Sequence, residues 1–274
     1  MNNEILKKLV RYSKFNQEYS SVNAFGKELN ELLANVEGTV SSVPKTNHVP
    51  TDENEDSGYN KRTTIKIEDD QANSMITDEW EKCDNLSELS AKIQGCEKCG
   101  MLSKGRKNIV FGSGNPNAEI VVVGEAPGAD EDEQGLPFVG RAGRLLTDIL
   151  AAINLSRDEV YICNILKCRP PENRNPQPEE ISNCEPYLSK QLELIKPKLI
   201  LALGTFAAQT LLGTREPLGK LRGKFHLYKN TKLLVTYHPA ALLRNPNWKR
   251  PTWEDVKMLR EEYDNINRII NERS

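Results

Sequence analysis

Four cysteines have types and spacing suited to a metal centre. Cys96 and Cys99 form a CxxC pair, and Cys168 and Cys184 follow on either side of the segment RPPENRNPQPEEISN. Four thiolates can hold a tetrahedral zinc ion or a 4Fe–4S cluster, and spacing alone does not separate the two. In a reducing compartment, clustered cysteines favour metal binding over disulfides. We therefore expect a structural metal centre that ties the start of a domain to a long loop.

Candidate functional residues also lie at the ends of three predicted strands: Gly124 with Glu125, Asn164, and His238. Near-continuous apolar runs bounded by turn residues are typical of strands buried on both faces. Four such runs are present, at residues 120–123, 160–165, 199–203 and 233–237. Ligands bind at the carboxyl ends of parallel strands, so these polar residues are expected to share one site.

Helical segments alternate with these strands, at residues 141–153, 178–196, 205–212 and 252–271. Pro178, followed by two glutamates, is typical of a helix N-terminus. Thr252, with Asp255 three residues later, resembles a capping box and predicts the start of the last helix. Alternating strands and helices imply right-handed crossovers. The predicted fold is therefore three-layer α/β/α around a central four-stranded parallel sheet.

The composition divides the chain into three regions. Residues 1–35 have apolar residues at helical spacing and are predicted to form a short helical extension, either a small helical hairpin or a helix that binds a protein partner. Residues 36–80 are polar and acidic, and are predicted to be a disordered linker. Residues 81–274 are predicted to be the functional domain. Residues 1–85 hold 16 acidic and 10 basic side chains, whereas the remainder holds 23 acidic and 27 basic, a balance that suits a nucleic-acid partner without requiring one.

The sequence also predicts where the protein works. It contains no run of 18 apolar residues, so no transmembrane helix or membrane partner is expected. Its N-terminus has no apolar core or small-residue cleavage site of a secretory signal. We expect a monomer in the cytoplasm, or in the nucleus if the host has one.

Three long motifs point to a known family. GEAPGADEDEQGLPFVGRAGRLL, at residues 124–146, has the wrong glycine spacing for a dinucleotide turn and does not match a Walker loop. With CNILKCRPPENRNP and HPAALLRNP, it resembles the type 4, iron–sulfur uracil-DNA glycosylases. The resemblance covers about residues 86–265 and places the four cysteines at the family's 4Fe–4S ligand positions. It implies a 4Fe–4S cluster as the cofactor and uracil-containing DNA, single- or double-stranded, as the partner.

The resemblance also assigns a uracil pocket, which receives a base flipped out of the DNA. Phe138 matches the aromatic side chain on which the base stacks. Asn164 presents an amide donor and acceptor that suit the O4 and N3–H edge of uracil and mismatch the amino group of cytosine. His238 matches a neutral imidazole that donates to uracil O2 as negative charge develops on the leaving base.

The first motif supplies the remaining pocket residues, with Gly124 and Ala126 in the backbone that approaches the base. Ala126 stands where some relatives have an aspartate, so a simple aspartate-activated water is not expected. Glu125 is instead expected to orient water or to stabilise the sugar cation. Glu131 is expected to crowd the C5 position of the base and so exclude thymine.

The last motif supplies the predicted DNA contacts. Leu242 lies four residues after His238, where related enzymes push an apolar side chain into the base stack. Arg244 is suited to contact phosphate. The predicted reaction is hydrolysis of the deoxyuridine N-glycosidic bond, which gives free uracil and an abasic site.

Two other functions remain open from the sequence. One is a DNA-binding module that has lost catalysis, although Glu125, Phe138, Asn164 and His238 are all present. The other is a relative that traps abasic DNA covalently through a histidine in the loop before the last strand. That loop reads REPLGKLRGKFHLY and contains His226, but it lacks an inserted basic segment. No lysine is placed as an obvious Schiff-base nucleophile, so lyase activity is not expected.

Overall fold

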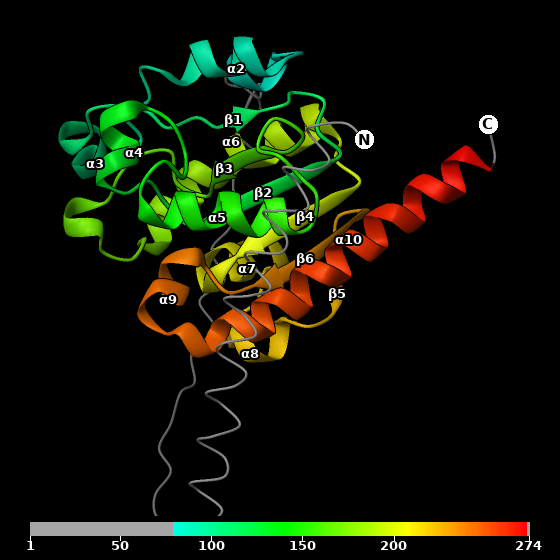
Figure 1. The fold of residues 1–274 in the computed structure, drawn as a ribbon. Coiled ribbons are helices and arrows are strands. Elements are labelled where there is room, and N and C mark those ends of the chain that lie inside the picture. The colour runs from blue at the N-terminus through cyan, green and yellow to red at the C-terminus, as the bar shows by residue number, and fades with distance from the viewer. Residues whose placement is uncertain (1–78, 273–274) are drawn as a thin grey trace, which may run out of the picture. The chain divides into compact units, whose positions relative to one another are not determined.

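A computed structural model of the chain describes residues 79–272 and contains a six-stranded sheet in the order β1-β3-β2-β4-β6-β5 (Figure 1). The four inner strands are mutually parallel. They are β3 (Tyr161–Asn164), β2 (Ile120–Gly124), β4 (Leu199–Leu203) and β6 (Thr231–Thr236). The predicted α/β class and the four parallel strands are confirmed, but the predicted strand count is wrong.

The two missed strands form the antiparallel edges of the sheet. β1 (Ser113–Gly114) has only two residues and pairs with β3, and β5 (Phe225–Tyr228) pairs with β6 across a tight turn. None of the four β5 residues is fully buried. Short or partly exposed edge strands lack the continuous apolar run by which buried strands are recognised.

Helices cover both faces of the sheet. Val121 and Val123 of β2 pack into one hydrophobic cluster, and Ile120 and Val122 pack into the other. The first cluster includes side chains of α2 (Leu86–Ile93), α6 (Pro178–Ile195) and α7 (Gly204–Leu212). The second includes side chains of α5 (Arg141–Ala152), α9 (Pro239–Arg244) and α10 (Lys249–Asn271). This arrangement is the predicted three-layer α/β/α fold.

Short helices fill the connections between these elements. They are α3 (Gly100–Gly105), α4 (Ala129–Gln134), η3 (Pro171–Asn173), α8 (Leu218–Leu221) and η4 (Pro246–Trp248). α6 begins at Pro178 as predicted, where Glu180 accepts a hydrogen bond from the Gln177 amide at 2.9 Å. The predicted start of the last helix is wrong by almost one turn. α10 begins at Lys249, and the hydroxyl of Thr252 donates to the Trp248 carbonyl from inside the helix at 2.8 Å.

The described fold begins with η2 (Glu79–Lys82), two residues before the predicted domain boundary. Trp80 of this segment packs edge-on against Tyr187 of α6, with 4.8 Å between ring centroids. The predicted helical extension at residues 1–35, its predicted protein partner and nearly all of the predicted linker at 36–80 lie outside the described residues. Within residues 79–272, no helix combines the length and the apolar composition needed to span a membrane.

The strand register brings the predicted site residues to one edge of the sheet. Gly124, the last residue of β2, pairs with Asn164, the last residue of β3. Leu203 of β4 pairs with Thr236 of β6, and His238 follows two residues later. The carboxyl ends of all four parallel strands therefore meet where a ligand is expected.

Candidate active site

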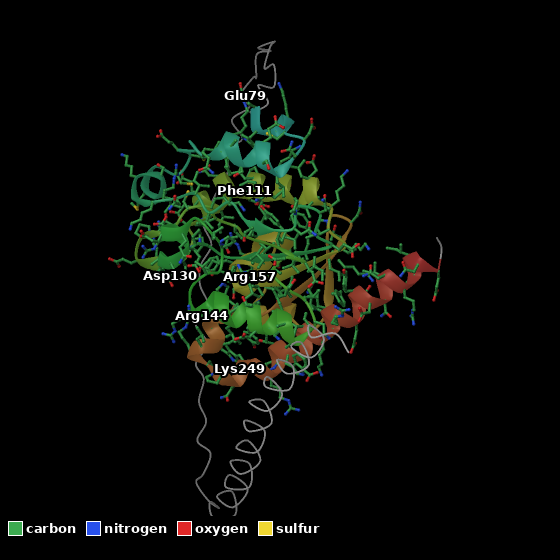
Figure 2. The ribbon with its side chains drawn as sticks, turned by 45° about the horizontal axis from the view of Figure 1, so that its top comes forward. Glu79, Phe111, Asp130, Arg144, Arg157 and Lys249 are labelled. Atoms are coloured by element: carbon green, nitrogen blue, oxygen red, sulfur yellow. The ribbon has the colours of Figure 1, made fainter. Side chains whose placement is uncertain are left out.

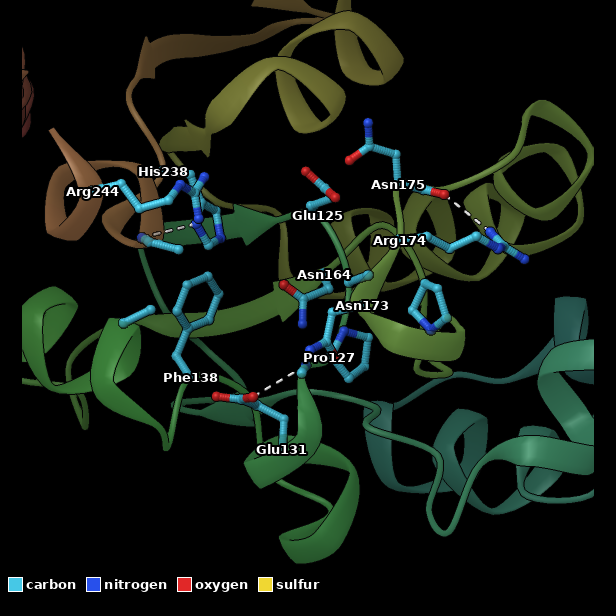
Figure 3. Close-up of a pocket in the computed structure, with 15 residues that line it drawn as sticks. Glu125, Pro127, Glu131, Phe138, Asn164, Asn173, Arg174, Asn175, His238 and Arg244 are labelled. Atoms are coloured by element: carbon cyan, nitrogen blue, oxygen red, sulfur yellow. Dashed lines mark hydrogen bonds between the residues drawn. The ribbon is translucent and has the colours of Figure 1, made fainter.

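A pocket of about 380 Å³ opens at this edge of the sheet (Figure 3). Seven of the predicted site residues line it: Glu125, Ala126, Glu131, Phe138, Asn164, His238 and Arg244. They come from segments more than 100 residues apart in sequence. The fold thus brings together most of the predicted uracil site, and Gly124 lies next to it between Asn164 and Phe138.

Asn164 is the residue whose chemistry most clearly calls for a ligand. It is only 2% exposed, and its Oδ1 is the one fully buried side-chain nitrogen or oxygen among residues 79–272 that has no hydrogen-bond partner. Leaving a buried carbonyl oxygen unpaired costs about 1–3 kcal/mol. A donor on a molecule bound in the pocket would satisfy this atom.

Gly124 keeps open the space between this amide and the aromatic ring. A Cβ atom on Gly124 would lie 2.3 Å from Asn164 Oδ1 and 2.6 Å from the nearest ring carbon of Phe138. Neither side chain can move away easily, because both are buried. Glycine at this position therefore allows the amide and the ring to line the same pocket.

The resemblance implies uracil release as the activity, and replacing Gly124 with alanine is expected to lower its kcat/KM by about 10- to 100-fold, in line with the cost of roughly 1–3 kcal/mol for overpacking. The added methyl group would push Asn164 or Phe138 out of place. Gly219→Ala is the matched control, because nothing lies within 4 Å of its Cβ position. Uracil release measured on both variants checks this result, and equal activity would contradict it.

Phe138 forms one wall of the pocket from an unusual backbone conformation. Its φ is 54°, a left-handed value that is uncommon for an aromatic residue, and its ring centroid lies 5.4 Å from that of His238. Glu131 supports the turn, because its carboxylate accepts hydrogen bonds from the amides of Val139 at 2.9 Å and Gly140 at 3.1 Å. It also accepts one from Gly128 at 3.1 Å. Both carboxylate oxygens are therefore engaged, a role that the sequence did not predict.

His238 presents a neutral imidazole to the pocket. Its Nδ1 accepts a hydrogen bond from the Ala240 amide at 3.2 Å, so the proton of the neutral ring lies on Nε2. Burial, aided by the positive charge of Arg244, lowers the pKa of His238 to about 4. The ring is uncharged at neutral pH and has one N–H to donate.

Glu125 supplies a carboxylate to the same pocket. Its backbone carbonyl accepts a hydrogen bond from Leu166 at 3.0 Å, which fixes the chain just after β2. Burial raises the pKa of Glu125, and the charge of Arg244 opposes this shift. Figure 3 places the carboxylate between His238 and Asn175, on the side away from Glu131.

The sequence analysis missed one wall of the pocket. Asn173, Arg174 and Asn175 line it, from the loop between two of the clustered cysteines. Arg174 anchors this loop through a bidentate ion pair with Glu180, at 2.9 and 2.6 Å. Asn173 has a φ of 54°. Asparagine tolerates this left-handed conformation, so the NRNP motif was the available signal.

The predicted role of Leu242 as a DNA wedge is wrong. Leu242 is 1% exposed and packs into the hydrophobic cluster that includes Ile149 of α5 and Trp253 of α10. α9 begins at Pro239, which turns Leu242 toward the core, whereas the next residue, Leu243, is 40% exposed. Arg244 is exposed at the pocket, as its predicted role requires.

The four clustered cysteines line one small cavity, together with Arg106, Lys167 and Tyr187 among others. Three hydrogen bonds reach their sulfur atoms. Arg106 donates to Cys168 at 3.4 Å, the Lys167 amide to Cys184 at 3.2 Å, and the Tyr187 hydroxyl to Cys96 at 3.3 Å. Within residues 79–272, no three histidine, cysteine, aspartate or glutamate side chains are arranged so that they could hold a single metal ion. Four cysteines around one cavity, with hydrogen-bond donors directed at three of the sulfur atoms, are a donor set suited to a thiolate-bound metal centre.

Comparison with known proteins places this chain in a family. A model of the uracil DNA glycosylase superfamily matches residues 111–257. The chain belongs to this superfamily. Type-4 uracil-DNA glycosylases of Archaeoglobus fulgidus and Saccharolobus solfataricus are each 46% identical to it, over 65% of this chain and over 93% and 86% of theirs. A type-5 uracil-DNA glycosylase of Pyrobaculum aerophilum is 32% identical over 52% of this chain and 70% of its own. The resemblance to type 4 is confirmed.

Among the described residues, neither His226 nor any lysine lines the pocket, where it would have to lie to form a covalent bond with DNA. His226 lies on β5 and contacts the Leu221 carbonyl at 2.6 Å, and it lines a different surface hollow. No lysine is among the described residues that line the glycosylase pocket. The covalent-trap alternative therefore has no support from the geometry.

Proposed function

We propose that this chain is a monofunctional uracil-DNA glycosylase that hydrolyses the N-glycosidic bond of deoxyuridine in DNA, for base excision repair. The observation that carries the proposal is the unpaired Oδ1 of Asn164, which faces a pocket between an aromatic ring and a neutral histidine. Uracil offers both an apolar face for the ring and an N–H for the oxygen. The family relationship supports the same reaction.

Recognition in this proposal rests on three contacts. A flipped uracil stacks on Phe138, whose ring is worth about 1–3 kcal/mol to a stacked base. Asn164 Oδ1 accepts the N3–H, and its Nδ2 donates to O4. Cytosine has an unprotonated N3 and an amino group in these places, so it would leave Oδ1 unpaired and set donor against donor.

Catalysis in this proposal rests on charge stabilisation. When the C1′–N1 bond breaks, its electron pair stays with the base and negative charge collects on O2. Nε2–H of His238 donates to that oxygen, a contact that strengthens as the charge grows. The carboxylate of Glu125 stabilises the positive sugar and orients the water that adds to C1′. The water's proton passes to Glu125 or to solvent, and the departing uracil anion takes up a proton from solvent.

DNA binding in this proposal uses the basic surface beside the pocket. Arg244 lies at the pocket itself, and Figure 2 labels Arg144 of α5 close to Lys249 at the start of α10, which Arg250 follows in sequence. α5 and α10 share the cluster that buries Leu242, so these basic side chains extend from helices that pack against one another. Leu243, which is exposed and directly precedes the pocket residue Arg244, replaces Leu242 as the candidate that enters the base stack.

We further propose that Cys96, Cys99, Cys168 and Cys184 hold a 4Fe–4S cluster. When bound, the cluster would supply a structural cross-link between the segment before α3 and the loop that forms one wall of the pocket. The hydrogen bonds to three of the sulfurs would stabilise their thiolates.

Replacing Cys184 with serine is expected to remove most of the bound iron and to lower the melting temperature by several degrees. The loop that contains Asn173 would then lose one of its anchors. Cys83→Ser is the matched control, since Cys83 is also buried but does not line the cysteine cavity. Iron analysis, visible absorbance and thermal unfolding check the prediction. Full iron content in Cys184→Ser would contradict the assigned ligand set.

The proposed function is tested by uracil release from oligonucleotides with one uracil, in single strands and opposite adenine or guanine. Alkali cleaves the abasic product, and a thymine strand serves as the control. Release by the cluster-loaded wild-type protein from the uracil strands alone supports the proposal. No release from that preparation would overturn it, and a DNA-binding module without catalysis would then be the better account.

A further inference from the structure

The turn that carries Phe138 is held by charged side chains on both sides. On one side, Arg157 Nη2 donates to the Pro137 carbonyl at 2.8 Å. On the other side, the Glu131 carboxylate accepts from the Val139 and Gly140 amides. A non-glycine residue in a left-handed conformation persists only where its surroundings hold it there. These contacts supply that constraint directly before and after Phe138.

Helix α5 presses on the same turn from a third direction. A Cβ on Gly143 would lie 1.8 Å from the Phe138 carbonyl oxygen, so only glycine lets the helix approach so closely. The backbone of Phe138 therefore has no room to move toward α5. The peptide groups on either side of Phe138 are the ones that hydrogen-bond to Arg157 and to Glu131.

Among the described residues, Arg157 makes few direct contacts besides this carbonyl, although the negative charges of Asp158 and Glu131 also act on it. It is half-buried, and no ion pair joins it to an acidic residue within residues 79–272. Its only other hydrogen bond is to the Thr147 hydroxyl, at the long distance of 3.5 Å. A partly buried cation whose shortest contact is a backbone carbonyl is well placed to fix that carbonyl.

We infer that Arg157 is a positioning residue for uracil: it sets the plane of the Phe138 ring on which the base stacks. The inference rests on the proposed function. The ring faces Asn164 across Gly124. A base on a tilted ring would no longer lie in the plane of the Asn164 amide, so both contacts to uracil would weaken together. Arg157 touches neither base nor sugar, and acts only through the turn.

The inference predicts a change in KM rather than in kcat. Arg157→Met removes the donors and keeps the apolar part of the side chain. Its KM for a uracil oligonucleotide and its dissociation constant for free uracil are expected to rise about tenfold, with kcat nearly unchanged, because stacking acts on bound substrate and transition state alike. Arg157→Lys, which restores one donor, is expected to recover part of the loss.

Arg260→Met is the matched control. Arg260 also donates to backbone carbonyls, those of Ile153 and Asn154 at 3.4 and 3.5 Å, but neither carbonyl belongs to the turn that carries Phe138. It also pairs with Asp264. Its loss is expected to lower the melting temperature slightly and to leave KM unchanged. This comparison separates loss of an arginine–carbonyl contact in general from loss of the contact that fixes Phe138.

A double-mutant cycle with Phe138→Ala decides whether Arg157 acts through the ring. In the Phe138→Ala background, adding Arg157→Met is expected to raise the dissociation constant for uracil by less than twofold. A full tenfold effect in the Phe138→Ala background would overturn the inference, as would a lower melting temperature with unchanged KM in Arg157→Met alone. If the wild-type protein releases no uracil, the proposed function fails, whereas an active wild type with an unaffected Arg157→Met refutes only this inference.

Discussion

Replacing Asn164 with alanine is expected to lower kcat/KM for uracil release by roughly 10²- to 10⁴-fold, because it leaves two buried polar groups of the base unpaired at a cost of about 1–3 kcal/mol each. The variant keeps Phe138 and His238, so it should still accept a base in the pocket. It would lose the two contacts that distinguish uracil from cytosine. Single-turnover release from a uracil oligonucleotide measures the change.

The same substitution is expected to leave the free energy of unfolding unchanged or to raise it. Oδ1 of Asn164 has no partner in the free protein, so alanine removes an unsatisfied buried group. Asn108→Ala is the control. The side-chain amide of Asn108 donates to the Asp132 carbonyl at 2.7 Å, and Asn108 does not line the pocket. That variant should lose stability and keep activity. The reverse pattern in the two variants would mean that Asn164 serves the fold rather than the ligand.

The sequence predicts that Asn164 lies in the site, but it does not predict that the Asn164 side chain lacks a hydrogen-bond partner. The sequence predicts Asn164 as a site residue because it ends an apolar run, and parallel strands bring such residues to one edge of the sheet. That rule needs only the strand pattern, which buried runs such as Ile120–Gly124 make plain. That Oδ1 would lack a partner depends on every neighbour in space, and no local pattern contains that information.

The errors share one physical cause, which is that short elements are fixed by tertiary contacts. Whether Leu242 faces the core or the solvent depends on the residue at which the six-residue helix α9 starts, and His238–Pro239 sets that point. The edge strand β1 exists because two residues pair with β3, not because of their propensity. Likewise, Asn173 reaches the pocket through a left-handed turn held by the Arg174–Glu180 pair.

Replacing His238 with alanine is expected to lower kcat by about 10²- to 10³-fold, the usual cost of removing a donor to an oxyanion in a transition state. The effect should fall on kcat more than on KM, since the contact to O2 strengthens only as the bond breaks. Phe138 and Asn164 remain to bind the base. A rise in KM by the same factor, with kcat unchanged, would assign His238 to substrate binding and not to the chemical step.

The pKa of His238 makes a second part of this prediction. Because that pKa is lowered to about 4, the neutral ring is present throughout pH 5–8 and is lost as the pH falls through about 4. The wild-type rate should therefore show no step near the ordinary histidine value of about 6.5. The unfolded chain takes up this proton at the higher pH, so the folded state loses stability as the pH falls from about 6.5 toward 4. Urea unfolding at pH 7 and pH 5 measures this loss, which should be smaller in His238→Ala. A rate step near pH 6.5 that disappears in His238→Ala would show instead that the imidazole is protonated in the free enzyme and acts as an acid.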